Sequence, residues 1–121
     1  GFPVWFNWAP TLVGFSADPT STVNRFKIEG NTVFAMVRHA VAGTSNGTTL
    51  TISLPVTAVT ITNAFWNWPF HAYVDNGTTG FNGDVWVVSA GTVMNFRTAS
   101  EGAWTNTGNK RIIGALIPYE I

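Results

Sequence analysis

The fold is decided by the stretch Gly43-Thr44-Ser45-Asn46-Gly47-Thr48-Thr49-Leu50-Thr51-Ile52-Ser53-Leu54-Pro55-Val56. Its first five residues predict a polar turn bracketed by two glycines. Beyond that turn, Leu50, Ile52 and Leu54 alternate with hydroxyl-bearing residues, which is the pattern of a half-buried strand, and a proline then ends it. Such a strand carries no catalytic group and indicates an all-β domain.

The same alternation recurs along the chain, and no segment of eleven or more residues has helical periodicity. The turns Glu29-Gly30-Asn31 and Ser89-Ala90-Gly91 each lie between two strands close enough to form a hairpin. We therefore predict one all-β domain over residues 1–121, a β-sandwich or jelly roll of about nine short antiparallel strands. The expected strands are Thr11–Phe15, Thr22–Glu29, Thr32–Ala42, Thr48–Leu54, Val59–Thr62, Phe70–Asp75, Asp84–Ser89, Thr92–Arg97 and Arg111–Ile121.

Composition limits the partners of this domain. A chain of 121 residues that is 45% hydrophobic can bury one core, and its apolar runs are shorter than the roughly 20 residues that cross a bilayer. We therefore expect no membrane insertion. Charged residues make up only 10% and the net charge is zero, so the chain lacks the basic surface that binds nucleic acid.

The scarcity of charge also predicts that part of the surface is covered by other copies of the chain. A strand that is apolar on both faces must be covered on both, in a core or at a subunit contact. The expected contact residues are Val33, Val37 and His39, together with the N-terminal aromatic residues Trp5 and Trp8. For the histidine, a hydrogen bond in the core or at an interface is favoured over metal binding.

No group of residues indicates catalysis. Cysteine is absent, which excludes disulfides, thiolate metal sites and thiol nucleophiles. The carboxylates and histidines fall in no motif for acid–base or nucleophilic chemistry. The loop from Asp75 to Asp84 contains oxygen ligands and glycines but lacks the spacing of a calcium-binding EF-hand. We therefore predict that the protein is not an enzyme and has no metal site and no cofactor.

Tryptophan is the strongest indication of a ligand, because an indole can stack on the apolar face of a sugar, although it is also a common core residue. Trp66 and Trp68 are two positions apart and share one face of an extended segment, so they are the predicted glycan platform. The predicted neighbours of this platform are His71, Tyr73 and Trp104. Trp86 alternates with valines and is expected to be buried.

Five stretches carry a likeness to a known family. They are Trp8-Ala9-Pro10-Thr11, Gly14 to Thr20, Gly30-Asn31-Thr32-Val33, Gly43 to Thr48 and Leu54-Pro55, with a weaker match from Ile112 to Ile121. In these turns and strand edges the chain resembles a β-sandwich module of bacteriophage tail, tail-fibre and minor structural proteins. The resemblance implies a non-enzymatic module on the virion that self-associates, as a trimer, and binds cell-surface glycans.

Because the chain starts at Gly1, we expect it to be one domain of a longer virion protein. Two alternatives remain open. One is a carbohydrate-binding module of an enzyme that degrades polysaccharides, for which the ligand would be a plant polysaccharide. The other is a capsid decoration protein that uses the same fold without a ligand.

Overall fold

The structure, a computed structural model, describes residues 4–61 and 65–121, without the side chains of Phe65, Pro69, Phe70 and His71. In this described part the fold is antiparallel and all-β, and its one helical element is a single 3-10 turn, η1 (Ala99–Glu101). The strands are β1 (Phe6–Asn7), β2 (Leu12–Val13), β3 (Phe15–Ala17), β4 (Thr20–Glu29), β5 (Thr32–Val41), β6 (Gly43–Ser45), β7 (Leu50–Ser53), β8 (Phe65–Asp75), β9 (Phe81–Val88), β10 (Val93–Arg97) and β11 (Asn109–Glu120). The all-β prediction is confirmed, although several strands are longer than expected.

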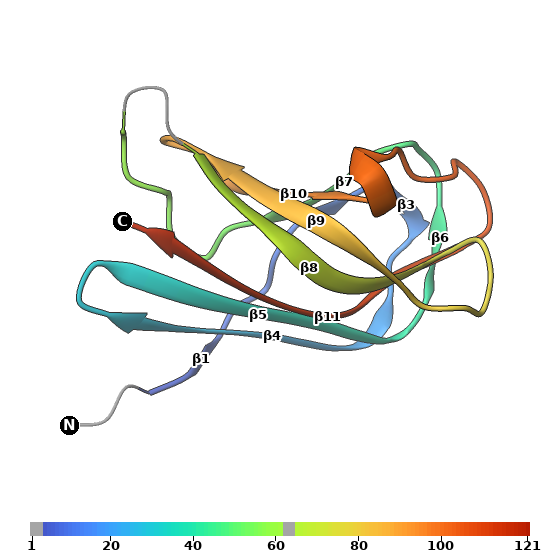
Figure 1. The fold of residues 1–121 in the computed structure, drawn as a ribbon. Coiled ribbons are helices and arrows are strands. Elements are labelled where there is room, and N and C mark those ends of the chain that lie inside the picture. The colour runs from blue at the N-terminus through green and yellow to red at the C-terminus, as the bar shows by residue number, and fades with distance from the viewer. Residues whose placement is uncertain (1–3, 62–64) are drawn as a thin grey trace.

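The strands join into one sheet that curves into a half-barrel, in the order β1-β4-β5-β11-β8-β9-β10-β7-β2, with β3 paired to β6 and β6 paired to β11. The sheet bends at β11, because the two halves of this strand pair with different strands. From Ala115 onward it pairs with β5, whereas its first half pairs with β6 and β8. Its register with β8 shifts between Ile112 and Gly114, and such a bulge bends a strand. Figure 1 shows β4 and β5 along one side of the molecule and β8, β9 and β10 along the other.

One core fills the space between these two sides, because alternate residues of the facing strands point inward. Burial alternates along β5 and along β9, as period-two sequences require. The buried hydrophobic side chains of the strands are Val33, Ala35, Val37, Leu50, Ile52, Tyr73, Val74, Val85, Val87, Met94, Phe96, Ile112, Ile117 and Tyr119. The other face of each strand is left for solvent or for partners.

The face of β5 that we expected at a subunit contact points into this core. Val33 and Val37 are completely buried, and His39 is 1% exposed. The imidazole Nδ1 of His39 accepts the backbone N–H of Ile112 at 3.2 Å. These three side chains are therefore covered within a single chain and offer no surface to a second copy. Trp5 and Trp8 are partly exposed.

Both predicted hairpins are present. Glu29 pairs with Thr32 across a two-residue loop, in which Gly30 has the positive φ of +62° that glycine adopts easily. In the second hairpin, β9 and β10 are antiparallel, and the N–H of Gly91 donates to the carbonyl of Val88 at 2.9 Å.

Two local predictions are wrong. The segment Gly43 to Ser45 is the short strand β6 rather than part of a turn, because Ser45 is buried and its hydroxyl donates to the carbonyl of Thr105 at 2.7 Å. Residues 59–61 form no strand, and Thr62 lies outside the described residues. The N–H of Val59 donates to Glu120 while its carbonyl accepts from Ala90, so the segment links two separate elements instead of extending one ladder.

β11 begins with a cation inside the protein. Lys110 is completely buried, and its ammonium donates to the carbonyl oxygens of Gly14 at 3.0 Å and of Thr49 at 2.8 Å. The rings of Phe15 and Trp104 lie 5.3 Å and 5.2 Å from it. Burial lowers the pKa of Lys110 to about 8, against the opposing effect of the Asp75 carboxylate. This lysine joins the segments around β3 and β7 to β11.

Candidate functional site

The outer face of the sheet carries a row of polar side chains around one tryptophan. Trp86 of β9 lies opposite Asn67 of β8 on one side and opposite Asn95 of β10 on the other. Asn95 in turn lies opposite Thr51 of β7. Directly opposed residues of antiparallel strands project from the same face, about 5 Å apart, so these four side chains form a line across four strands. All four are at least partly exposed.

Beside this row lies an ion pair. Arg97 of β10 is opposite Asp84 of β9, and its guanidinium binds both carboxylate oxygens, with Nε 3.0 Å from Oδ1 and Nη2 on Oδ2. This hydrogen bond to Asp84 raises the pKa of Arg97, so the guanidinium stays charged. The same group lies over the indole of Trp86, 5.4 Å from the ring centre. The ion pair therefore continues the Trp86 surface.

A second carboxylate completes the cluster. Glu101 Oε1 lies 3.8 Å from Arg97 Nη2, and the Glu101 side chain is 71% exposed. With Asp84 and Glu101 each carrying −1 and Arg97 carrying +1, the cluster has a net charge of −1 at neutral pH. It therefore favours neutral or cationic ligands over anionic ones.

Glu101 is held in a strained turn. Ser100 and Glu101 have φ of 58° and 59°, and the N–H of Gly102 donates to the carbonyl of Ala99 at 3.2 Å. Two central residues with positive φ define a type I′ turn, which normally contains asparagine and glycine. For other residues this conformation costs roughly 1–2 kcal/mol each. Ser21, Asn76 and Ala90 also have a positive φ, so this conformation is not confined to the turn that carries Glu101.

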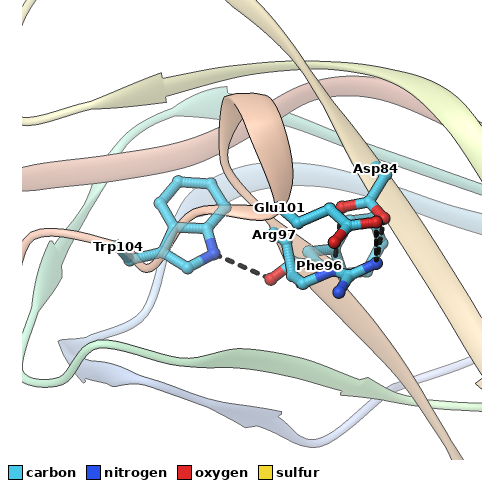
Figure 2. Close-up of polar contacts among 5 residues, drawn as sticks. All are labelled: Asp84, Phe96, Arg97, Glu101 and Trp104. Carbon is cyan, nitrogen blue, oxygen red and sulfur yellow. Dashed lines mark hydrogen bonds and ion pairs between the residues drawn. The ribbon is translucent and has the colours of Figure 1, made fainter.

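The core holds this turn from below. The hydroxyl of Tyr73 accepts the N–H of Ala99 at 2.9 Å, and Thr98 and Gly102 exchange two backbone hydrogen bonds of 3.1 Å. The indole N–H of Trp104 donates to the carbonyl of Phe96 at 2.9 Å. Figure 2 shows Glu101 beside the Asp84 and Arg97 pair, with the Trp104 ring lying apart from them.

Tyr73 and Trp104 therefore lie beneath the cluster rather than in it. They are 4% and 2% exposed, and their rings pack edge to face with centres 5.1 Å apart. We predicted both as neighbours of a bound sugar, but their ring faces are covered by protein atoms. What they do in this structure is position the segment that carries Glu101.

Two hollows of about 270 Å³ each adjoin Glu101. One is bounded by Trp86, Asn95 and Arg97, and the other by Asn67, Asn82 and Asp84. Both lie just below the range of about 300–1,000 Å³ that is usual for small-molecule sites. Each is therefore a shallow depression, of a size for one small polar ring.

The predicted platform of Trp66 and Trp68 has a different setting. The two residues lie opposite Val87 and Val85, which are core residues, so they share a face as expected, but it is the inner face of the sheet. Trp66 packs against the core. Trp68 is 38% exposed, and its indole N–H donates to the carbonyl of Pro118 at 2.8 Å beside a hollow of about 240 Å³. His71 pairs with Gly83 through the backbone, and its side chain lies outside the described part.

We expected Trp86 to be buried, but it is partly exposed, and the sequence did contain a signal that it faces outward. In Asp84-Val85-Trp86-Val87, the tryptophan lies two positions after an aspartate and so projects from the same face of the strand. An acidic residue seldom faces a core. The two valines therefore had to be the inward residues. What the sequence could not show is which strands flank β9 and bring Asn67 and Asn95 to either side of the indole.

Among residues 4–61 and 65–121, no three or more histidine, aspartate or glutamate side chains are grouped in a way that could hold a metal ion. Nor does this part of the chain contain a helix long and apolar enough to span a membrane. Comparison of the chain with protein-family models, with curated proteins and with solved structures finds no match.

Proposed function

We propose that this chain is a non-enzymatic β-sandwich module that binds glycans on the outer face of β7, β8, β9 and β10. The observation that carries the proposal is the row of Asn67, Trp86, Asn95 and Thr51 across four strands. A sugar ring offers an apolar C–H face that packs on an indole, and hydroxyls around its edge that pair with amides, hydroxyls and carboxylates. The row places these partners in line, and the single core between the two sides of the half-barrel supports the sandwich or jelly-roll class.

The proposed setting is a phage particle, in a tail fibre or another tail-associated protein, where the glycan is a receptor on the cell surface. The likeness of the turns and strand edges to phage modules supports this setting. A carbohydrate-binding module of a polysaccharide-degrading enzyme would use the same face. In a capsid decoration protein the face would have no sugar ligand, so binding measurements separate this third candidate from the other two.

The proposal includes self-association, as a trimer, through the outer face of β4, β5 and β11. Leu116 is 54% exposed there and lies opposite Met36, while the neighbouring pair is Pro118 and Phe34. An exposed apolar group of this kind on a chain with little charge favours contact with another protein surface. This face does not overlap the Trp86 row, so assembly and glycan binding can occur together.

The test compares two tryptophan variants. On a glycan array, and by calorimetry with the best glycan found, Trp86→Ala is expected to weaken binding by about 2 kcal/mol, as loss of a central aromatic anchor does. Trp68→Ala, the control, should leave binding unchanged. The reverse result would assign the ligand to the platform of Trp66 and Trp68. If the unmodified domain binds no glycan, the proposal fails and the decoration protein becomes the better candidate.

A further inference from the structure

Three asparagines of this chain are each followed by glycine, in the pairs Asn46-Gly47, Asn76-Gly77 and Asn82-Gly83. Asparagine is a thermolabile residue, and its side-chain amide is lost most easily before glycine, which has no side chain to hinder attack by its own backbone nitrogen. The three pairs consist of the same two residues. Any difference in their reactivity within the folded protein therefore comes from the structure around them.

The pair Asn46-Gly47 lies where the chain passes from β6 to β7, and hydrogen bonds hold both of its ends. The N–H of Asn46 donates to the carbonyl of Gly14 at 3.2 Å. The carbonyl of Gly47 accepts from Ser45 Oγ at 3.1 Å and from Lys110 Nζ at 3.3 Å. Among the described residues, the peptide group between Asn46 and Gly47 makes no hydrogen bond. This peptide group can therefore rotate while the ends of the pair stay in place.

The surroundings of Gly47 leave room for a reaction. Asn46 is exposed and Gly47 is partly exposed. Apart from its neighbours in the chain, no described atom lies within 4 Å of the point where a Cβ on Gly47 would stand, and Gly47 does not have a left-handed φ. The backbone nitrogen of Gly47 is thus open to the amide carbon of Asn46, and water reaches both groups.

The other two pairs are more constrained. Asn76 has a left-handed φ of 50°, and its side chain packs against Gly108, with Cγ 2.7 Å from the point where a Cβ on Gly108 would stand. Asn82 and Gly83 belong to β9 and pair with β8, and Gly83 is buried. To react, Asn76 must first leave Gly108, and Asn82 must first leave the ladder. Both requirements slow the reaction relative to that of Asn46.

We propose that Asn46-Gly47 is a site of spontaneous deamidation. The backbone nitrogen of Gly47 loses its proton to solvent base and bonds to Cγ of Asn46, the side-chain nitrogen leaves as ammonia, and a cyclic imide remains. Water then opens the imide. Cleavage at the side-chain carbonyl gives aspartate, and cleavage at the main-chain carbonyl gives isoaspartate, in which the main chain runs through the side chain. One amide and one water thus give one carboxylate and one ammonia, without a catalyst or a cofactor.

The isoaspartate product changes the segment that holds Lys110. It adds one methylene to the main chain before Gly47, which is a C–C bond of about 1.5 Å. The carbonyl oxygens of Gly47 and Thr49 lie 3.3 Å and 2.8 Å from Lys110 Nζ, so a displacement of this size breaks at least one of these hydrogen bonds. The isoaspartate form is therefore less stable than the unmodified protein.

The experiment follows the three pairs separately while the unmodified domain stands at neutral pH. Chymotrypsin cleaves after aromatic residues and leucine, so it places the pairs in the peptides 35–50, 74–81 and 82–86. Mass spectrometry measures the deamidated fraction of each peptide, and digestion in ¹⁸O-labelled water marks any amide lost during digestion. Peptide 35–50 is expected to deamidate severalfold faster than the other two. In guanidinium, where the chain is unfolded, the three rates should be similar.

Gly47→Ala is the test variant, because its methyl group hinders the attacking nitrogen and the structure has room for it. Deamidation of peptide 35–50 should slow severalfold. Gly77→Ala is the matched control, since its position is also open, with the nearest atom 3.9 Å away, and it should leave the rate of peptide 35–50 unchanged. The proposal is overturned if peptide 35–50 does not lead in the folded protein, if its lead persists in guanidinium, or if Gly47→Ala reacts as fast as the unmodified protein.

A second measurement tests the effect on Lys110. The deamidated protein, isolated by ion exchange through its additional negative charge, contains the isoaspartate form. It should unfold at a lower urea concentration than Asn46→Asp, which has the same charge and a main chain of normal length. Equal unfolding of the two would overturn the proposed effect of isoaspartate on the hold of this segment on Lys110.

Discussion

The hydroxyl of Tyr73 lies 2.9 Å from the backbone nitrogen of Ala99 and accepts its N–H, which joins a core strand to the turn that carries Glu101. Tyr73 is 4% exposed, whereas the side chain of Glu101 is 71% exposed. A buried residue therefore positions a surface carboxylate. The face that we propose binds glycans is thus supported from inside the core, and changes in the core should alter it.

Replacement of Tyr73 by phenylalanine should show this coupling. The variant keeps the ring but leaves the Ala99 N–H without its acceptor, and we expect a loss of about 1 kcal/mol in the free energy of unfolding. Glycan binding should weaken as well, because the Glu101 turn loses an anchor. Chemical denaturation and calorimetry measure the two effects. Tyr119→Phe is the control, since it removes a buried hydroxyl that bonds Val56 at 2.7 Å far from this turn. It should lower stability and leave binding unchanged.

Glu101→Gly is expected to raise stability while it lowers glycan affinity. Glycine adopts a positive φ without steric cost, so relief of strain should add about 1 kcal/mol to the free energy of unfolding. The carboxylate beside Arg97 is lost at the same time. Ser100→Gly relieves strain at the neighbouring position and keeps the carboxylate. This variant should therefore be more stable than the unmodified protein and bind glycan with the same affinity. Equal affinity of both variants would show that Glu101 has no part in binding.

Stability should fall as the pH drops from neutral, because of His39. Burial, with a smaller contribution from the charge of Arg111, lowers the pKa of His39 from 6.5 to about 4. Below pH 6.5 the unfolded chain takes up a proton that the folded protein does not bind, so the folded state loses stability until the pH reaches about 4. Between about pH 7 and pH 5 the loss should be about 2 kcal/mol. Urea unfolding at these two values measures it, and in His39→Gln this difference should largely disappear.

Lys110→Met should be strongly destabilising. Methionine is close to lysine in length but donates no hydrogen bond, so the carbonyl oxygens of Gly47 and Thr49 would lose the ammonium, and that of Gly14 would keep only the N–H of Asn46. We expect a loss of about 3 kcal/mol or more in thermal or urea unfolding. Lys27→Met is the control, because the Lys27 ammonium pairs with Glu29 at 2.9 Å near the surface, and such pairs contribute about 1 kcal/mol or less. Similar losses in both variants would contradict a structural role for the buried cation.

Sedimentation tests the proposed self-association. The unmodified domain is expected to sediment as a trimer at micromolar concentration, and Leu116→Asp should give monomers, since it places a charge on the exposed outer face of β11. Val13→Asp, a change at an equally exposed site on β2, should remain a trimer. A monomeric unmodified domain would contradict the assembly proposal and leave the glycan proposal as it stands.

The sequence by itself determined the all-β class, both hairpins and most strand positions. These features are local, because alternation of side chains and turn residues such as Gly30 act within a few positions of the chain. It also determined which residues of a strand share a face, such as Trp66 and Trp68. The alternation of residues along a strand does not say which of its two faces points inward.

The face of each strand that points inward is decided by the tertiary structure. Trp66 and Trp68 lie on the inner face because their partners across the ladder are the buried residues Val87 and Val85, and these contacts join distant parts of the chain. The Trp86 row likewise depends on the order in which four strands pair. Local patterns constrain single strands, whereas the assembly of β7, β8, β9 and β10 is settled only when the strands pack together around a common core.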